Sequence, residues 1–256
     1  MKNNAVVALL LGRAGSIGFP GKNTFPLMGR PLMRYPMLAA ENSKYVTHRF
    51  FSTDSEEYKA IGRANGWDII DRPDYLATKT ALGEDAIVHA MGEIKKRLAG
   101  TEVEMVAQLF CNAATVLAFH IDQGVGMLRA DANADSAVTV SVYNMWSPLR
   151  ARKVNAGGYL APFVPFETFG DPKTLNCDRD SQGDVCFADM GLNLVRPYCI
   201  ENIHNGLLPQ KWMGKKILPI KQWGGCDIDY EWQVPQTEFW LRKHGFSESK
   251  TPYDGK

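Results

Sequence analysis

The first half of the chain alternates short apolar runs with segments whose apolar residues recur at helical spacing. Ala5–Leu11 is a continuous apolar run, which is typical of a parallel strand covered on both faces. Ser55–Asn65 has helical spacing, and Ser55 is placed to cap a helix whose first turn carries two glutamates. By the same patterns we expect strands at His48–Ser52, Trp67–Ile70, Met105–Phe110 and Ser136–Val142, and helices at Leu32–Ser43, Glu84–Leu98 and His120–Ala130. The alternation predicts an α/β fold in three layers, Rossmann-like, with a mostly parallel sheet between helices.

The alternation stops between about residues 144 and 184. This segment is rich in Gly, Pro and aromatic residues, and its apolar runs are short. Because a disordered linker would carry fewer aromatic residues, we expect a small lobe inserted into a single domain that spans residues 1–256. Regular structure returns in strands predicted at Gly191–Val195 and Lys216–Ile220 and in a helix predicted at Val234–His244.

Composition narrows the classes of partner. The formal net charge is +1, from 29 basic and 28 acidic residues, so we expect neither a nucleic-acid nor a membrane surface. Lys2 and the seven apolar residues that end at Leu11 imitate a leader peptide, but the run opens into a glycine-rich turn and is expected to be a buried strand. The five cysteines form no C-x-x-C pair, which argues against a disulfide framework or a structural zinc site. We therefore expect reduced thiols and a cytoplasmic protein.

The turn after the first strand carries the most informative chemistry. Residues 12–23 read G-R-A-G-S-I-G-F-P-G-K-N. Glycines allow backbone amides to approach a phosphate closely, and Arg13 and Lys22 supply positive charge. The spacing matches neither G-x-x-x-x-G-K-[ST] nor G-x-G-x-x-G, so the two commonest phosphate-binding motifs are excluded. The residues alone allow a triphosphate site or a surface turn with incidental basic residues.

Four motifs, in order along nearly the whole chain, resemble those of the CMP-acylneuraminate synthetases and related cytidylyltransferases. The turn resembles the A-R-x-G-S-K-G-x-P-G-K-N signature of that family. The other three are F-S-T-D-S-E at 51–56, Arg72-Pro73 followed by Leu76-Ala77 and Thr80, and D-I-D at 227–229. The resemblance implies a nucleotidyltransferase of the nucleotide-diphosphosugar type, which couples CTP to an acidic sugar such as a sialic, legionaminic or pseudaminic acid.

The resemblance also implies roles for individual residues. Arg13 and Lys22 would bind the triphosphate and stabilise charge in the transition state, with Asp229 as the third catalytic residue. The residues predicted to bind the nucleotide are Gly12, Arg13, Gly15, Ser16, Lys22, Asn23, Arg72 and Asn112.

Two acidic residues near the C-terminus suggest a metal site. On an extended strand, Asp227 and Asp229 would share one face while Ile228 turned to the core. Two carboxylates suit Mg²⁺, but they suit a helix cap or a salt bridge equally well. The family resemblance favours Mg²⁺ as the cofactor.

Three departures from the family pattern bear on the substrate. Ile17 replaces a lysine of the signature, Leu82-Gly83 replaces a pair of serines, and residues 108–116 have lost the Gln and Arg of an acceptor loop and keep Asn112 as the chief polar group. The acceptor therefore stays open between nonulosonic acids and another acidic acceptor such as a phosphonate. Arg179 corresponds to a basic patch for the sugar carboxylate or is an exposed loop residue. Arg150 lies in the lobe that family members use to form a homodimer, and a homodimer is expected.

Two other classes of protein compete with this prediction. A non-catalytic nucleotide-binding relative would not need the C-terminal acids. A dinucleotide-binding oxidoreductase would need an acidic residue at a strand end, whereas Glu41 lies on a predicted helix. The five histidines are scattered and form no triad motif, and His89 and His120 are expected to be structural.

Overall fold

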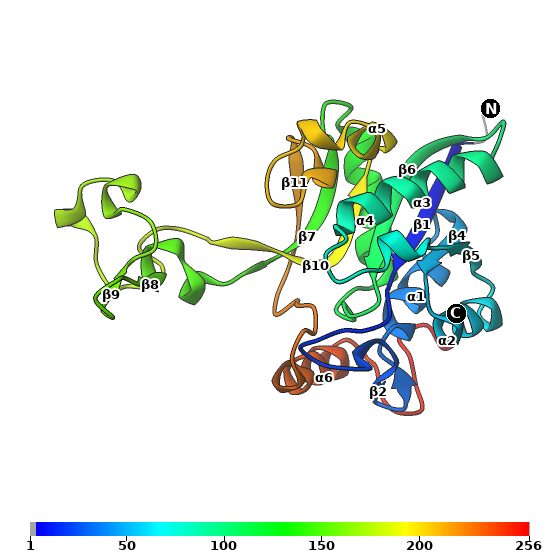
Figure 1. Cartoon of the computed structure of the whole chain (residues 1–256), viewed down its shortest axis with the longest axis horizontal. Coiled ribbons are helices and arrows are strands. Elements are labelled where there is room, and N and C mark those ends of the chain that lie inside the picture. The colour runs from blue at the N-terminus through cyan, green and yellow to red at the C-terminus, as the bar shows by residue number, and fades with distance from the viewer. Residues whose placement is uncertain (1–3, 256) are drawn as a thin grey trace.

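The computed structural model of the chain describes residues 4–255 and is built on one twisted sheet (Figure 1). The sheet has seven strands in the order β11-β7-β10-β6-β1-β4-β5, and β10 alone runs antiparallel to its neighbours β6 and β7. Its strands are β1 (Asn4–Leu11), β4 (Val46–Thr53), β5 (Asp68–Asp71), β6 (Glu102–Phe110), β7 (Ser136–Val142), β10 (Cys186–Val195) and β11 (Ile217–Gln222). The predicted mostly parallel α/β sheet is confirmed.

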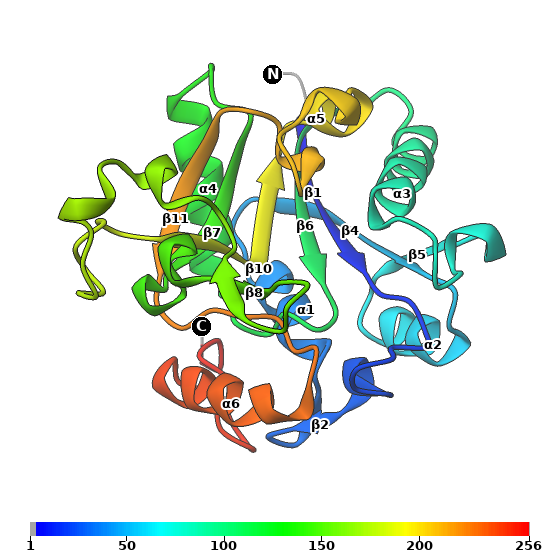
Figure 2. The ribbon, with the colours of Figure 1, turned by 60° about the vertical axis from the view of Figure 1, so that its left-hand side comes forward.

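Helices cover both faces of this sheet, as predicted (Figure 2). The helices are α1 (Arg34–Glu41), α2 (Glu56–Ala64), α3 (Gly83–Arg97), α4 (Ala118–Ala130), α5 (Pro197–Glu201) and α6 (Val234–Lys243). One core joins the sheet to α1, α2 and α4, and a second joins the opposite face to α3, α5 and the short turn Lys211–Met213. A third, smaller core packs α6 and its C-terminal neighbour Phe246 against the β2–β3 hairpin (Pro26–Leu27 and Arg30–Pro31).

The first strand and the second helix form for the reasons that the sequence indicates. Every residue of Ala5–Leu11 is buried because strands pair with β1 on both edges and helices cover both its faces. The Ser55 hydroxyl accepts a hydrogen bond from the Tyr58 amide at 3.4 Å, so the predicted N-cap of α2 is confirmed.

The boundaries of several elements differ from the prediction. Strand β10 begins at Cys186, five residues before the predicted start at Gly191. Its pairing register shifts between Ala188 and Asn193, and Met190 has a φ of +63°. This irregularity interrupts the alternation of side chains, and it explains why the periodic pattern begins only after it.

Residues 143–185 leave the sheet as a projecting arm (Figure 1). The arm starts where β7 ends and returns where β10 begins, and its only sheet is the two-stranded pair β8 (Arg152–Val154) and β9 (Leu160–Pro162). Large apolar side chains on it are exposed; they are Met145, Trp146, Val154, Tyr159, Leu160 and Phe163. Within residues 4–255 no helix has both the length and the apolar character needed to cross a membrane.

His120 lies beside Trp240 of the third core, with only 6% of its surface exposed. Its Nδ1 accepts a hydrogen bond from the Leu117 amide at 3.1 Å, which requires the neutral ring. Burial, and then the nearby His244, lower the pKa of His120 to about 4. Because the folded pKa lies below the unfolded value, this residue stabilises the fold fully above pH 6.5, and that contribution is lost as the pH falls toward 4.

A glutamine at this position would keep the hydrogen bond without titrating. We therefore expect the wild-type free energy of unfolding to fall by up to about 3 kcal/mol more than that of His120→Gln between pH 7.5 and pH 4. Urea unfolding at pH 7.5, 6, 5 and 4 measures the difference. Parallel pH profiles for the two proteins would contradict the neutral buried ring.

Candidate active site

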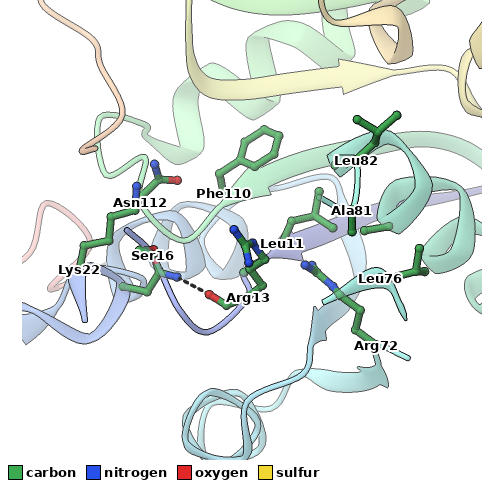
Figure 3. A pocket seen from close by; sticks show the side chains of 14 residues that line it. Leu11, Arg13, Ser16, Lys22, Arg72, Leu76, Ala81, Leu82, Phe110 and Asn112 are labelled. Atoms are coloured by element: carbon green, nitrogen blue, oxygen red, sulfur yellow. Dashed lines mark hydrogen bonds between the residues drawn. The ribbon is translucent and has the colours of Figure 1, made fainter. Parts of the chain in front are cut away.

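The glycine-rich turn leaves the carboxyl end of β1 and borders a pocket of about 220 Å³ (Figure 3). Phe110 and Leu82 lie on the side of the pocket opposite Arg13 and Arg72. The residues predicted to bind nucleotide that line this pocket are Gly12, Arg13, Ser16, Lys22, Asn23, Arg72 and Asn112.

Some backbone amides of the turn donate hydrogen bonds within the protein, and others do not. The Gly12 amide donates to the Ser52 carbonyl at 3.3 Å, and the Ala14 amide donates to Asp54 Oδ1 at 3.0 Å. In the described part of the chain the amides of Gly15 and Ser16 have no protein acceptor. These two amides are thus available to a phosphate, whereas the amide of Gly12 is already used.

Glycine is required in this turn for two different reasons. A Cβ at Gly12 would lie 2.4 Å from Cys111 Sγ, so the turn packs directly against the residue that follows β6. Gly15 has a φ of +78°, in the left-handed region that favours glycine, and it does not line the pocket. The structure therefore gives Gly12 a packing role, which the sequence does not reveal.

Arg72 is a buried cation directed at the pocket (Figure 3). Its Nε and one terminal nitrogen donate to Ser52 Oγ and the Ser52 carbonyl at 3.4 and 3.0 Å. Among the residues described, it forms no ion pair, although Asp54 contributes attraction from a distance. Burial lowers the pKa of Arg72, and the charge of Arg13 lowers it further. A buried guanidinium without a carboxylate partner is suited to an anionic ligand, since the ligand would supply the missing charge.

Lys22 faces the C-terminal acids across the mouth of the pocket. Its Nζ lies 2.5 Å from Asp229 Oδ1, and its side chain is only 11% exposed. The sequence allowed either a salt bridge or a metal site at Asp229, and the structure contains the salt bridge. Since the Asp229 side chain is 56% exposed, its carboxylate also stays accessible to a ligand.

Asp227 and Asp229 lie in an irregular loop after β11, so the expectation that they share one face of a strand is wrong. Their carboxylates nevertheless lie near each other, because both accept hydrogen bonds from one side chain. Asn112 Nδ2 donates to Asp227 Oδ2 at 3.3 Å and to Asp229 Oδ1 at 3.4 Å. Ile228 between them is fully buried in the third core, as predicted. We refer to residues 223–229 as the acid loop.

The two carboxylates fit the donor set of a hard divalent cation. Burial, and then the charge of Asp229, raise the pKa of Asp227, and a bound cation would relieve both effects. No cluster of three or more His, Cys, Asp or Glu side chains able to hold a metal occurs within residues 4–255. The protein would therefore supply two oxygen ligands, which is usual for Mg²⁺ held together with substrate phosphates and water.

Several pocket residues were not predicted from the sequence. Phe110, Leu82 and Ala86 form an apolar side of the pocket, and Leu82 is 60% exposed there. Asp54 holds the turn through the Ala14 amide. The motif around Asp54 was recognised, but a hydrogen bond to a backbone 40 residues away leaves no local signal in the sequence.

Arg179, considered for the acceptor carboxylate, and Arg150, considered for the dimerisation lobe, both lie in the arm. Arg179 Nε contacts its neighbour Asp180 at 3.4 Å, and its side chain is 70% exposed. Arg150 donates to the Cys177 carbonyl within the arm and lines a groove there with Arg152. Neither arginine lines the pocket at the turn. Of the two alternatives for Arg179, the structure therefore shows the exposed loop residue.

Ile17 marks the clearest difference from the family signature. Its side chain is 71% exposed and borders the space between the turn and the acid loop, together with Tyr230. An apolar group therefore occupies the side of the turn where the signature has a lysine. Lys22 is thus the lysine on this side of the pocket that is available to contact a phosphate.

The central sheet and the helices that cover it have the nucleotidyltransferase fold. Residues 7–108 match the model of the family described as Cytidylyltransferase, and the predicted resemblance to the cytidylyltransferases is confirmed. The matched segment contains the turn, Asp54 and Arg72.

Relatives and solved structures agree with this assignment. The chain is 37% identical over 86 residues to an N-acylneuraminate cytidylyltransferase of Escherichia coli O18:K1:H7, covering 34% of this chain and 20% of that protein. It is 25% identical over 231 residues to an N-acylneuraminate cytidylyltransferase of Oncorhynchus mykiss, covering 90% of this chain and 49% of that protein. The chain therefore spans at most about half the length of these relatives.

A solved structure supports the fold. CMP:2-keto-3-deoxy-manno-octonic acid synthetase, in complex with CTP, superposes with a TM-score of 0.65 at 14% identity. The superposition covers 94% of this chain and 99% of that one. At this identity the likeness concerns the fold, which places β1 and its turn in a known nucleotidyltransferase architecture.

Proposed function

We propose that this chain transfers CMP from CTP to an acidic sugar and releases pyrophosphate. The observation that carries the proposal is the convergence of Arg13, Lys22 and buried Arg72 on one pocket, with two carboxylates at its mouth. A pocket with three cations and free turn amides suits a polyphosphate. The family match of residues 7–108 and the named activities of the relatives support cytidine as the nucleoside.

In the proposed reaction, a hydroxyl oxygen of the acceptor attacks the α-phosphorus of CTP. The new bond joins acceptor oxygen to phosphorus, the bond between the α-phosphorus and the bridging oxygen breaks, and pyrophosphate leaves with the electron pair. Arg13, Lys22 and Arg72 would hold the triphosphate and neutralise the charge that grows on its oxygens. The acceptor hydroxyl gives up its proton to solvent water in this step, so the transfer releases one proton together with pyrophosphate.

Asp227 and Asp229 would hold Mg²⁺ in this proposal, with Asn112 orienting both carboxylates. When bound, the cation would offset phosphate charge and acidify a coordinated hydroxyl. Lys22 would exchange its partner Asp229 for phosphate oxygens when the nucleotide binds, because the lysine both pairs with Asp229 and lines the pocket.

We propose an acidic sugar of the nonulosonic or octulosonic type as acceptor, since the relatives carry those substrates in their names. The altered loop at 108–116 keeps a phosphonate or another acidic acceptor as the alternative. A non-catalytic nucleotide-binding relative is the second candidate function. A cytoplasmic location stays a prediction.

The decisive experiment measures pyrophosphate release with Mg²⁺, each of the four NTPs, and a panel of nine-carbon and eight-carbon acidic sugars and phosphonates. Release that requires both CTP and one acceptor is the expected result, and it would identify the acceptor. CTP binding by calorimetry without release across the panel would favour the non-catalytic relative. Release with another NTP would contradict the proposed base.

We also propose that the chain is a homodimer joined through its arm. A two-stranded pair such as β8–β9 is marginally stable in water unless something covers it. Tyr159 and Leu160 are 74% and 72% exposed at this pair, which is unusual for large apolar side chains that cluster together. A second copy of the arm would bury them.

Replacing Tyr159 and Leu160 together with serine is expected to convert the dimer to monomers, because it removes the apolar surface that association would bury. Sedimentation velocity over a range of protein concentrations measures the change. Phe119→Ser on α4, where the side chain is 64% exposed, is the matched control and should leave the assembly unchanged. A wild-type monomer at all concentrations would refute the homodimer.

A further inference from the structure

A buried polar cluster lies directly behind the acid loop. Asp189, on the irregular part of β10, is only 5% exposed, and Ser141, near the end of β7, is fully buried. The Ser141 hydroxyl donates to Asp189 Oδ2 at 2.8 Å and accepts from the Gly225 amide at 2.9 Å. The hydroxyl thus links the carboxylate on the sheet to the backbone of the acid loop.

Hydrogen bonds hold the acid loop at two neighbouring points, one where β11 ends and one just before Asp227. Gln222 Nε2 donates to Asp189 Oδ2 at 2.9 Å, which fixes the end of β11 where the loop begins. The Cys226 amide and carbonyl both bond to Thr115 Oγ1, at 3.0 and 3.1 Å. The next residue is Asp227, so the backbone is fixed immediately before the first carboxylate.

Two further contacts show how tightly the cluster is built. A Cβ at Gly225 would lie 2.3 Å from Asp189 Oδ2, so only glycine lets the loop approach the carboxylate. Tyr143, at the root of the arm, donates its hydroxyl to the Gly225 carbonyl at 2.8 Å. The arm and the acid loop therefore share one anchor.

We infer that Asp189, acting through Ser141, is a positioning residue for the acid loop, which it holds in the place that presents Asp227 and Asp229 to the ligand. A buried carboxylate is costly to desolvate, and its hydrogen-bond partners offset that cost. Asp189 Oδ1 accepts from the Gly191 amide on its own strand at 3.2 Å, whereas Oδ2 accepts from Ser141 and Gln222, the two groups that lead to the acid loop. The Oδ2 side of the carboxylate is therefore fully satisfied when the loop is in place. The inference rests on the proposed function for its catalytic consequence, but the positioning of the loop is measurable without it.

The test compares two serines on the same strand. Ser141→Ala removes the link between Asp189 and Gly225. Ser136→Ala is the matched control, because Ser136 is also fully buried and donates at 2.6 Å to the Met213 carbonyl, at the far end of β7. Ser141→Ala loses two buried hydrogen bonds and Ser136→Ala loses one, so both are expected to lose thermal stability and Ser141→Ala to lose more. Asp189→Asn serves as a second variant, because an amide cannot accept at both carboxylate oxygens.

Hydrogen exchange of the peptide that spans residues 223–229, in the full-length protein, reports loop position directly. We expect exchange there to rise about tenfold in Ser141→Ala and Asp189→Asn, and to stay at the wild-type rate in Ser136→Ala. In the pyrophosphate assay we expect kcat to fall about tenfold in the first two variants with KM for CTP nearly unchanged, since the loop contributes to the reacting geometry rather than to nucleotide affinity.

The outcomes separate the two proposals. Unchanged exchange in the 223–229 peptide would overturn the positioning role, and so would faster exchange with full kcat. If the wild-type protein turns over no acceptor, the proposed function fails, and the exchange comparison still decides whether Asp189 holds the loop.

Discussion

Replacing Lys22 with alanine is expected to lower kcat/KM for nucleotidyl transfer by about 10²–10³-fold. Lys22 is the lysine between the turn and the acid loop, and Ile17 stands where the family signature has another. Its charge is largely shielded from water, since the side chain is 11% exposed, so its interaction with phosphate would be weakly screened. Steady-state kinetics with CTP and the identified acceptor measure the loss.

The control for this change is Lys95→Ala. Lys95 also forms an ion pair of 2.5 Å, with Glu201. It lies near the C-terminal end of α3, whereas the N-terminal end of that helix lines the pocket. Both variants should unfold within about 1 kcal/mol of wild type, because the carboxylate of each pair stays exposed to water and such pairs contribute little to stability. Near-normal activity of Lys22→Ala would remove this lysine from the reaction.

Replacing Asp229 with asparagine is expected to abolish activity or its dependence on Mg²⁺. Asparagine preserves the shape of the side chain but removes one of the two carboxylates that would hold the cation. It also leaves Lys22 without its partner, so apo-protein binding of CTP should be retained or strengthened while turnover is lost. The measurements are pyrophosphate release over a Mg²⁺ titration and calorimetric binding of CTP without metal.

The control here is Asp254→Asn, an acid whose contacts are to Thr251 near the C-terminus. It should keep the wild-type Mg²⁺ profile. An Asp229→Asn variant with unchanged activity and an unchanged Mg²⁺ profile would refute the metal assignment.

The repeating elements were predictable because their signals are local. Ala5–Leu11 is an apolar run of strand length and Ser136–Val142 is rich in β-branched residues, and both are strands with close to the predicted ends. The Ser55 cap depends on residues three positions apart. Such patterns are complete within one segment, so a single sequence contains them.

The site was predictable only where chemistry and motif coincide. Arg13, Lys22 and Arg72 were found because charged residues follow buried strands in recognisable motifs, and the structure brings them to one pocket. Asp189 was missed because its partners Ser141 and Gln222 come from β7 and β11, and Ser141 in turn accepts from the acid loop; only the tertiary fold brings these segments together. The irregular path of residues 223–229 was missed for the same reason: Asn112 and Ile228 fix it through contacts about 115 residues apart.

The way in which the arm leaves the sheet makes it a detachable module. Its two ends are neighbours, since the Tyr143 amide donates to the Val185 carbonyl at 2.9 Å and β7 and β10 pair directly below. A segment that departs and returns at one point can lengthen, shrink or be exchanged without altering the order of the seven strands. Evolution could therefore change the proposed dimer contact while the pocket at the carboxyl end of β1, which takes none of its lining from the arm, stays the same.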